Sequence, residues 1–557
     1  MNIAKKILPV VSILTLSLLA IQPFFHKEFF PIHDATQVAR VFEMHQSLQG
    51  LMFPVRWVQD LGYGYGYPIF SFYAPLAYYL GAFFMFLGFS ALLATKIMIA
   101  LGVVLAGVTM YFFSKELFGE KAGVLSGVLY VFAPYHALNI YVRGAIGEVW
   151  AYAFIPLAFL GFLQIAKKPT WISISLAVGG LVGIIISHNL TALIVAPFLL
   201  VEIAVLFFRF PGKASRKGLL LGLILSFLIS SWYTLPAVFE MGYTNVVSQT
   251  GGGSDYKDHF VCPSQLWSSQ WGFGGSTSGC LDGLSFQIGK IHILLAAIGL
   301  SSVLFLKRKK ERRIGLLLAL GILVATLMVL PVTKPLWDTL SFMKYLQFPW
   351  RFLQIDLFFI SLLGGFSVFL FAFIEERLKT KYSGVVILSL TITILGIAFF
   401  YTKLFQAQFF YDPYPDQTKK STLNWDISRI SDEYLPATFS RPHSRDEVPS
   451  LPYRPTETAS VEILVDTPGQ LILSVNAVAD SHLILNRAYF PVWHITLDGH
   501  RASYAIGNGL YDVVIPEGSH NLTVVFEQTP LERVSNILSL VGIVLLVLGI
   551  LLRRFTL

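Results

Sequence analysis

The chain has 557 residues, of which 55% are hydrophobic, 15% aromatic and only 13% charged. A soluble protein carries roughly 25% charged residues, so this composition excludes a chain built only of ordinary soluble domains. The net charge of +8 does not indicate nucleic-acid binding, because the basic residues stand in short clusters between apolar runs, where they determine membrane topology. The sequence therefore predicts an all-α polytopic membrane protein with one additional β-rich domain.

The apolar runs predict about twelve transmembrane helices, since roughly 20 apolar helical residues cross a bilayer core of about 30 Å. The expected spans are residues 7–25, 94–113, 121–141, 149–166, 171–187, 190–208, 218–239, 291–306, 314–332, 352–374, 384–401 and 534–552. Basic and non-basic loops alternate between them. The basic stretches are Lys5-Lys6, Lys115 to Lys121, Lys167-Lys168, Arg209 to Lys217, Lys307 to Arg313, Arg377 to Lys381 and Arg553-Arg554. By the positive-inside rule these stretches and both termini are expected to be cytoplasmic, in a multi-pass protein of the plasma or inner membrane.

Residues 69–90 are also apolar enough to resemble a span. If they crossed the membrane, the loop at 114–121 and every later basic loop would lie outside, against the positive-inside rule. We therefore expect this aromatic and proline-containing segment to be re-entrant or to lie along the outer interface.

Three long segments then fall on the extracytoplasmic face, namely the first loop at 26–93, the loop 240–290 and a soluble tail at 402–533. The expected units are a transmembrane domain over 1–401, the tail domain over 402–533, and a final helix with its cytoplasmic end over 534–557. From about Ser460 the tail alternates apolar and polar residues, which predicts an antiparallel β-sandwich of six to eight strands. Its turns are expected at Asp498-Gly499, Asn508-Gly509 and Glu517-Gly518.

The two cysteines, Cys262 and Cys280, both fall in the loop 240–290. An oxidising compartment permits a disulfide that closes this loop. The alternative is a pair of unpaired thiols.

The first candidate for chemistry is His33-Asp34-Ala35-Thr36-Gln37, directly after the first span. A carboxylate at the membrane surface acts as a general base towards a hydroxyl or binds a metal. In the alternative, Asp34 and Gln37 are a capping pair at the start of the following helix.

The second candidate is the stretch from Arg143 to Glu148, on the same predicted face. An arginine binds a phosphate through two parallel hydrogen bonds and keeps its charge at any physiological pH. In the alternative, Glu148 complements the dipole of the next helix and Arg143 pairs with Glu148.

Three further groups carry polar residues near membrane depth, where they are costly and therefore candidates for function. These are Ser187-His188-Asn189, Trp350-Arg351 and Arg56-Trp57. Their structural alternatives are turn capping for the first group and interfacial anchoring for the other two. The glycine-rich stretch from Gly62 to Pro68 has no following Lys-Ser or Lys-Thr, so it is not predicted to be a phosphate loop and instead suggests a lipid or sugar groove.

Together these groups resemble a known membrane family. The stretches His33 to Thr36, Phe53 to Trp57, Gly64 to Leu76, Arg143 to Glu148, Ser187 to Asn189 and Phe348 to Phe352 resemble the 6-pyruvoyl-tetrahydropterin synthase-related membrane family, a label that implies no pterin chemistry. That family in turn resembles the GT-C superclass of glycosyltransferases, which use lipid-linked sugars and a catalytic acidic residue in the first outer loop. The tail, with Tyr489 to Trp493 and Leu497 to Gly499, looks like the terminal domain of related bacterial glycosyltransferases.

The resemblance implies a transferase that takes a sugar from a polyprenyl-phosphate carrier, with Asp34 as the base and Glu148 as a second candidate acid or base. It assigns substrate binding to His33, Arg56, Arg143, His188, Asn189, Trp350 and Arg351. The expected partners are the lipid-linked sugar and membrane lipid, and no nucleic acid. No cofactor is certain. A divalent cation stays open, because Asp34 stands without the paired acidic residues that hold a metal in the oligosaccharyltransferase branch, and no zinc-ligand spacing occurs. Two other functions compete, a transporter or flippase of lipid-linked glycans and a non-catalytic envelope assembly protein.

Overall fold

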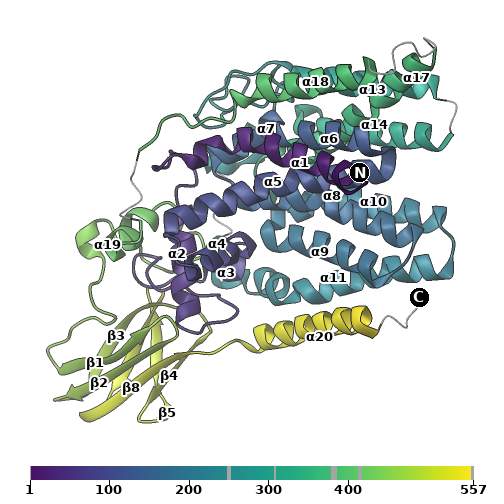
Figure 1. Cartoon of the computed structure of the whole chain (residues 1–557). Coiled ribbons are helices and arrows are strands. Elements are labelled where there is room, and N and C mark those ends of the chain that lie inside the picture. Colours follow the sequence, from purple (N-terminus) through teal and green to yellow (C-terminus); the bar gives the residue numbers. More distant parts are fainter. Residues whose placement is uncertain (1, 247–251, 307–308, 378–384, 412–416, 553–557) are drawn as a thin grey trace.

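The computed structural model describes residues 2–246, 252–306, 309–377, 385–411 and 417–552. Helices lie side by side in a bundle, and a β-domain sits beyond one end of it (Figure 1). The helices are α1 Asn2–Ala20, α2 Gln37–Gln49, α3 Ile69–Phe72, α4 Leu76–Phe86, α5 Ala91–Phe118, α6 Glu120–Val131, α7 Pro134–Leu138, α8 Ile146–Lys167, α9 Trp171–Ser187, α10 Asn189–Arg209, α11 Lys213–Phe239, α12 Pro263–Trp267, α13 Lys290–Phe305, α14 Lys309–Val329, α15 Lys334–Thr339, α16 Leu353–Phe366, α17 Val368–Arg377, α18 Val385–Thr402, α19 Lys420–Thr422 and α20 Pro530–Leu552. A π-helical turn, Asn139–Arg143, follows α7, and a 3-10 turn, Pro349–Phe352, precedes α16.

The chain is a mostly helical, multi-span membrane protein. Within the described ranges, eight helical runs are long and apolar enough to cross a bilayer: Ala91–Phe118, Glu120–Arg143, Ile146–Lys167, Asn189–Arg209, Lys213–Tyr243, Lys309–Val329, Pro349–Phe371 and Pro530–Leu552. The other four of the twelve expected spans fall on shorter apolar helices, Ile7–Ala20, Trp171–Ser187, Lys290–Phe305 and Ile387–Thr402. In α9 the capping box at Thr170 and the extended backbone of His188 set the limits, so the helix is shorter than a typical span.

Residues 69–90 form short helices rather than a long one. α4 has 11 residues, so it is about 16 Å long, roughly half of the bilayer core. It packs against α2 and against the start of α5. This geometry agrees with the expectation that the segment does not cross the membrane.

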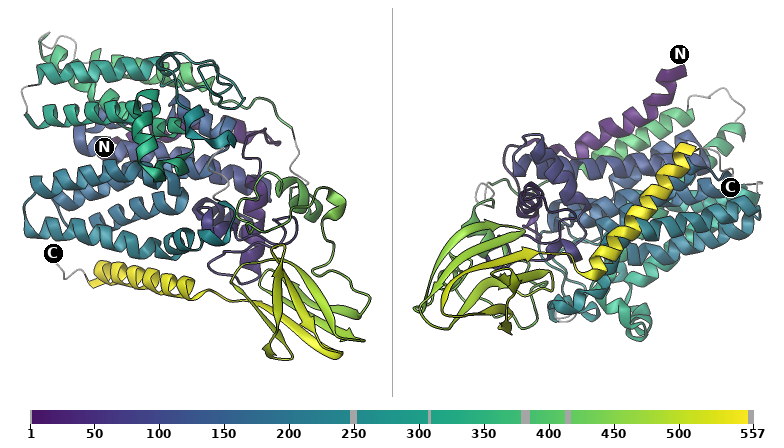
Figure 2. Two further views of the ribbon diagram at one scale, coloured as in Figure 1. Left: turned by 180° about the vertical axis from the view of Figure 1, so that it is seen from behind. Right: turned by 90° about the horizontal axis from the view of Figure 1, so that it is seen from below.

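The long segments meet at one end of the bundle, here called the loop end. His33 Nε2 lies 3.0 Å from the Phe273 carbonyl oxygen, which joins the first loop to the loop 240–290. The Asn245 N–H donates to the Leu435 carbonyl at 2.8 Å, which joins that loop to the tail. Figure 2 shows the β-domain and the short helices on this same end in two further views.

Basic turns gather at the opposite end. Lys167 Nζ lies 2.7 Å from Glu116 Oε1, and Ser215 Oγ donates to the Ala166 carbonyl at 3.0 Å, so three of the expected basic loops lie together. The stretches Arg377 to Lys381 and Lys307 to Arg313 lie partly outside the described residues, and Arg553-Arg554 lies wholly outside them.

The tail contains the predicted antiparallel strands. They are β1 Ala459–Thr467, β2 Gln470–Ala477, β3 Ser481–Ala488, β4 Trp493–Leu497, β5 His500–Arg501, β6 Tyr504–Gly507, β7 Leu510–Ile515 and β8 Gly518–Phe526. One sheet has the order β1-β2-β8-β4-β5 and the other β3-β7-β6. The turns at Asp498-Gly499 and Asn508-Gly509 have positive φ at both residues, as two-residue hairpin turns require.

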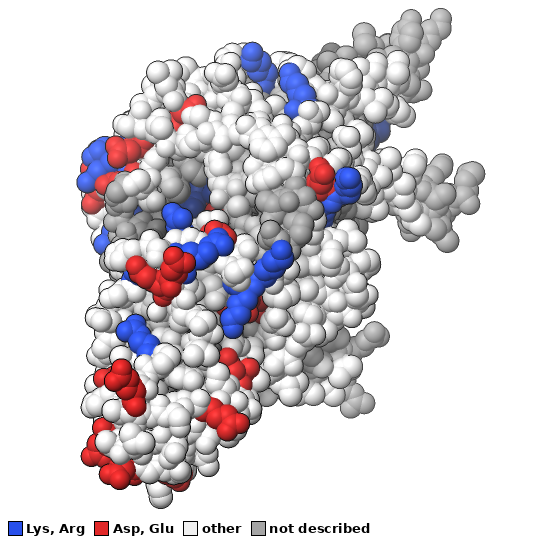
Figure 3. Space-filling view, turned by 90° about the vertical axis from the view of Figure 1, so that its left-hand side faces the viewer, with Lys and Arg blue, Asp and Glu red and all other residues white. Residues whose placement is uncertain are grey.

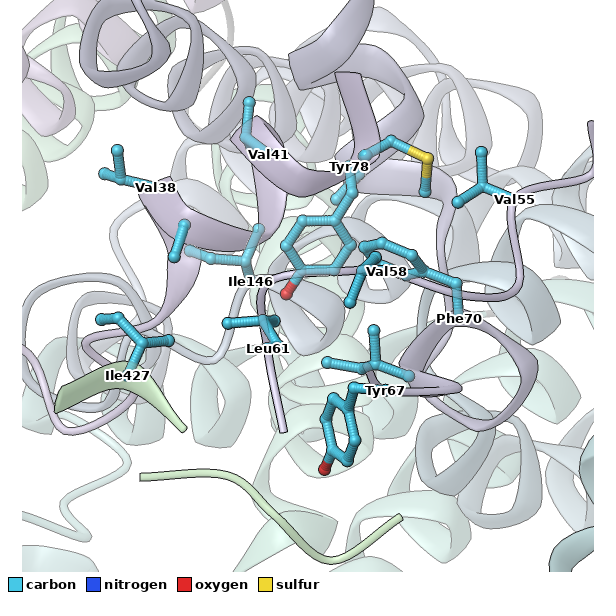
Figure 4. Close-up of a cluster of buried hydrophobic side chains, with 14 of the residues drawn as sticks. Val38, Val41, Val55, Val58, Leu61, Tyr67, Phe70, Tyr78, Ile146 and Ile427 are labelled. Atoms are coloured by element: carbon cyan, nitrogen blue, oxygen red, sulfur yellow. The ribbon is translucent and has the colours of Figure 1, made fainter. Parts of the chain in front are cut away.

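A hydrophobic cluster joins the first loop to its neighbours at the loop end. It joins the first loop and α2 to α4, to the start of α8 and to the tail (Figure 4). Its labelled members are Val38, Val41, Val55, Val58, Leu61, Tyr67, Phe70, Tyr78, Ile146 and Ile427. A close-packed core of this kind has low compressibility, so it holds the neighbouring polar residues in fixed positions.

Candidate active site at the loop end

The first loop is hydrogen-bonded to the turn that precedes α8. The Asp34 N–H donates to the Arg143 carbonyl at 3.0 Å, and Gln37 Nε2 donates to the Gly144 carbonyl at 2.9 Å. Gly144 has a φ of +65°, and a Cβ there would lie 2.5 Å from Ile32 Cδ1. Glycine is therefore needed at this position, both for the left-handed backbone and for the close approach of the loop.

Asp34 does not cap α2. The N-cap residue is Thr36, no side chain makes the capping hydrogen bond, and Gln37 is engaged with Gly144 instead. Among the described residues, no backbone N–H of α2 donates to the Asp34 carboxylate. The alternative that Asp34 caps α2 is therefore wrong. Its half-buried side chain does not stabilise the start of this helix.

Cations surround Asp34. Burial raises the pKa of the Asp34 carboxyl above its usual value. Arg40, Arg143 and Arg351 lie within electrostatic range and oppose that effect, whereas Glu148 adds to it. The structure thus brings together Asp34, the pair Arg143 and Glu148, and Arg351, which come from three separate stretches of the sequence.

Glu148 is the centre of a buried ion network. Its two carboxylate oxygens accept from the two Arg143 amino groups, each at 2.8 Å. Arg351 Nε lies 3.3 Å from Glu148 Oε1. Tyr135 and Asn139 also donate to Oε2, at 3.1 and 3.3 Å. Because Glu148 is only 1% exposed and accepts from so many donors, it serves to hold the two guanidinium groups in place.

The aromatic neighbours fix the two arginines further. The Arg143 guanidinium lies 4.4 Å over the Trp350 ring, and that of Arg351 lies 5.1 Å from the Phe348 ring. Trp350 itself stacks on Phe286. Trp350 is therefore a buried platform for Arg143, which does not fit the alternative of an interfacial anchor.

Arg351 keeps donors that no atom of the described chain accepts from: its buried Nε has no hydrogen-bond partner, although it forms an ion pair with Glu148. Arg351 Nη1 donates to the Leu346 carbonyl at 2.8 Å and to Gln347 Oε1 at 3.2 Å. Within the described chain, the Arg351 Nη2 amino group has no hydrogen-bond partner. Arg351 therefore offers a fixed, positively charged donor beside Asp34.

His188 lies within electrostatic range of the Glu148 network. Its Nδ1 accepts from the Thr191 N–H at 3.2 Å, so the neutral ring carries its proton on Nε2. His188, rather than Ser187 or Asn189, caps α10. Asn189 is exposed and its side chain bonds only to the neighbouring Leu190 N–H.

The side chains of two candidate binding residues make their contacts outside this cluster. Arg56 Nε lies 3.3 Å from Glu532 Oε1 at the start of α20, and both side chains are buried. His33 is exposed and contacts the loop 240–290. Arg56 therefore joins the first loop to α20. Its partner Glu532 is far from the Arg56-Trp57 motif in the sequence.

Sequence reasoning missed Arg40. It lies in α2, 4% exposed, with its guanidinium 4.2 Å over the Tyr73 ring. Its Nη2 donates to Ser431 Oγ of the tail at 2.9 Å, and Glu433 lies within electrostatic range. The available signal was the polar face of α2, where Arg40 lies about one helical turn from Gln37 and from Glu43 in the helix that directly follows the Asp34 motif.

The residues present do not fit a divalent cation. In the described chain no group of three His, Cys, Asp or Glu residues gathers. Around Asp34 the cations Arg40, Arg143 and Arg351 outnumber the carboxylates of Asp34 and Glu148, and divalent cations prefer several carboxylate or carbonyl oxygens. The local charge suits a bound anion instead.

The space-filling view of the loop end shows a hollow with basic side chains inside it (Figure 3). Anionic ligands enter such a hollow favourably, because a low-dielectric wall strengthens the field of the basic groups. Two pockets lined by other residues lie elsewhere. One is at Trp57 and Arg487, and the other at Tyr256 and Trp337.

Comparisons with known proteins agree with a membrane assignment. The family model described as a 6-pyruvoyl-tetrahydropterin synthase related domain, a membrane protein, matches residues 70–400, which is more than half of the chain. A curated protein of Lactococcus lactis subsp. cremoris (strain MG1363), named as an uncharacterized protein, is 24% identical over 219 residues. That match covers 38% of this chain and 36% of the relative, so this chain spans little more than a third of the relative's length.

Two kinds of solved structure are also similar. The cryo-EM structure of arabinofuranosyltransferase AftD from Mycobacteria is 13% identical with a TM-score of 0.45, over 72% of this chain and 27% of that chain. The apo crystal structure of the Archaeoglobus fulgidus oligosaccharyltransferase is 15% identical with a TM-score of 0.43, over 80% of this chain and 62% of that chain.

Proposed function

We propose a glycosyltransferase function for this chain, which belongs to the 6-pyruvoyl-tetrahydropterin synthase-related membrane-domain family. The enzyme transfers a sugar from a polyprenyl-phosphate donor to an extracytoplasmic acceptor, which is a cell-envelope glycan, a glycolipid or a protein. One observation carries the proposal. The Asp34 carboxylate caps no helix and lies within electrostatic range of three arginines at the loop end. A base and an anion-binding group therefore occur together.

The proposed reaction is an inverting displacement at the anomeric carbon. Asp34 accepts the proton of the acceptor hydroxyl as the hydroxyl oxygen bonds to that carbon. The bond between the anomeric carbon and the phosphate oxygen breaks, and the polyprenyl phosphate leaves with the electron pair. The raised pKa of the Asp34 carboxyl suits a base, because a catalytic pKa nearer the working pH transfers protons more effectively.

Arg351 and Arg143 stabilise the leaving phosphate. Negative charge grows on that phosphate in the transition state, and fixed donors that need no reorganisation are the most effective there. The unused Arg351 Nη2 is the donor that we assign to the phosphate oxygen. Glu148 positions both arginines, and the Nε2 proton of His188 orients the sugar.

We place the loop end on the extracytoplasmic side. The Cys262–Cys280 disulfide, with a Cα–Cα distance of 5.6 Å, lies at this end, and disulfides persist in oxidising compartments. The basic turns at the opposite end, such as that at Lys167, support a cytoplasmic position for that end. Both termini are cytoplasmic in this orientation.

The test is transfer of radiolabelled sugar from a set of polyprenyl-phosphate carriers by the purified protein in liposomes. Asp34→Asn keeps the shape of the side chain but removes the base, so transfer should fall by about two to four orders of magnitude. Arg533→Gln, which changes an exposed ion pair with Glu527, is the matched control and should leave transfer unchanged. Full transfer by Asp34→Asn protein of normal abundance would exclude this mechanism.

A transporter or flippase of lipid-linked glycans is the second candidate, favoured by Asp356. This residue is fully buried within the span Pro349–Phe371, and its Oδ2 accepts from Thr326 at 3.1 Å. Carboxyl groups at membrane depth are typical of ion-coupled carriers. Movement of the labelled carrier across the liposome without sugar transfer would favour this function.

A further inference from the structure

A pocket lies between the first loop and the β-domain. Trp57, Tyr65 and Gly66 of the loop form one wall, and Asp466, Asn486 and Arg487 of the β-domain form the other. The pocket is shallow: the centre of a water-sized sphere can move through about 40 Å³ of it, and the figure rises to about 420 Å³ only when all non-atom space, open solvent included, is counted. It contains none of the residues of the Asp34 cluster, so nothing in the proposed reaction uses it.

The glycine-rich stretch of the first loop builds this pocket. The Ala488 N–H of β3 donates to the Tyr65 carbonyl at 2.7 Å, which holds the loop on the β-domain. Gly66 has a φ of +81° and a Cβ there would collide with the Trp57 ring. Trp57 in turn meets Trp493 edge-on, with ring centroids 5.2 Å apart. The motif thus fixes the positions of Trp57 and Tyr65 in this wall.

Two buried polar side chains in the pocket each have one atom without a hydrogen-bond partner. Arg487 is 4% exposed, and its Nη1 has no hydrogen-bond partner in the described chain. Asn486 is 6% exposed, and its Oδ1 is likewise unpartnered there, whereas its Nδ2 donates to the Leu451 carbonyl. A buried donor or acceptor left unpaired costs about 1–3 kcal/mol, so both atoms favour a ligand with complementary groups.

The positive charge of Arg487 is only partly neutralised. Its Nη2 lies 3.4 Å from Asp466 Oδ1, which also accepts from Gln59 Nε2 at 2.9 Å. Burial lowers the pKa of the Arg487 guanidinium to about 10, against the opposing effect of Asp466. Lys420 also lines the pocket; its side chain is 60% exposed and its Nζ lies 3.6 Å from Asp60 Oδ1, so its charge is partly compensated as well. An anionic group is therefore favoured near Arg487.

We propose that this pocket binds a sugar residue through its anionic substituent, a carboxylate or a phosphate. The substituent accepts from Arg487 Nη1, and a ring hydroxyl donates to Asn486 Oδ1. The open mouth leaves room for the next residues of a glycan chain. The site recognises an acidic saccharide and is separate from the Asp34 cluster, so binding here does not depend on the proposed transferase reaction.

The test uses saturation-transfer difference NMR on the full-length protein in detergent micelles. The probes are methyl β-D-glucuronide, glucose 6-phosphate, methyl β-D-glucoside and inorganic phosphate. At least one of the two acidic sugars should bind, about tenfold or more tightly than the neutral glucoside, because a charge-assisted hydrogen bond is lost in the glucoside. The acidic sugar that binds more tightly shows whether the site prefers a carboxylate or a phosphate. Equal binding of the glucoside would overturn the requirement for charge, and equal binding of inorganic phosphate would overturn the requirement for a sugar.

Variants locate the site. Arg487→Gln should abolish binding of the acidic sugar, and Lys420→Glu, at an exposed position, should weaken it about threefold or more. Arg501→Gln changes an exposed cation of β5 in the same domain and should have no effect. Unchanged binding in Lys420→Glu and Arg487→Gln would overturn the proposal. Asp34→Asn should bind normally, which separates this result from any failure of the transferase assay.

Discussion

Replacement of Glu148 by glutamine tests the ion network at the loop end directly. Glutamine keeps the length of the side chain and one carbonyl acceptor, but it removes the charge that Arg143 and Arg351 share. Both guanidinium groups are only 8% exposed, so water cannot replace the lost carboxylate. They would then repel each other across the vacated ion pair.

The expected loss of stability follows from this burial. Removal of one partner from a buried ion pair costs about 3–5 kcal/mol, because the other charge stays buried and unpaired. An unfolding entropy of roughly 2.1 cal/mol/K per residue gives about 1.2 kcal/mol/K for 557 residues. The unfolding midpoint of Glu148→Gln should therefore fall by about 3–4 °C.

Thermal unfolding of the purified protein in detergent, followed by tryptophan fluorescence, measures this shift. Glu116→Gln is the control, because Glu116 also pairs with a lysine, Lys167, but both side chains are about one-third exposed. Exposed pairs contribute about 0–1 kcal/mol, so the control midpoint should move by less than about 1 °C. Equal midpoints for Glu148→Gln and the wild type would refute the view that Glu148 holds the two arginines.

The remaining predictions concern topology, the tail and pH. Single cysteines at Glu120 and Arg312 should resist an impermeant thiol reagent applied outside the cell, and labelling of both would reverse the orientation; Cys262 and Cys280 are disulfide-bonded and should not react. An isolated fragment of residues 455–530 should give the circular dichroism of β-structure, since it contains β1 to β8, and a helical spectrum would contradict this. Because burial raises the pKa of Asp34 in the folded protein, the stability that Asp34 contributes is complete below its unfolded pKa and is lost as pH rises through the folded pKa. Unfolding midpoints of Asp34→Asn should lack this pH dependence, and a wild-type profile that coincides with the variant's profile at every pH would disprove it.

Patterns of short range in the sequence gave reliable predictions of local structure. The turn at Asn508-Gly509 was predictable because both positions require positive φ, which these residues adopt at low cost. The short helix α4 was predictable because a crossing there would have placed the basic loops on two faces. The first inference depends on two adjacent residues and the second on the order of basic loops along the chain, so neither requires knowledge of a tertiary contact.

The partners of the charged residues could not be predicted in the same way. Arg56 was grouped with the candidate substrate-binding residues, yet its partner Glu532 lies hundreds of residues away in α20. Arg40 went unnoticed because the tail residue Ser431, which accepts from it, is equally distant. These two contacts form only because the C-terminal part of the chain packs on the first loop. The spacing of residues in a single sequence does not predict that packing.

The motif at Arg143 to Glu148 stands between these two cases. The sequence offered the ion pair between Arg143 and Glu148 as an alternative, and the structure contains this ion pair. The sequence did not indicate that Arg351 shares the same carboxylate, because that contact joins α8 to the 3-10 turn before α16.

The π-helical turn Asn139–Arg143 makes the length of the chain, as well as its residue types, a determinant of the site. A π turn holds one more residue than an α turn, and here it allows Asn139 and Arg143 to hydrogen-bond with each other and with Glu148. Deletion of any one residue from this turn would restore α-helical geometry and rotate Arg143 by about 100° relative to Tyr135. Related proteins with the same site should therefore align without insertions or deletions between α7 and α8, whereas the exposed loop around Gly275 should tolerate both.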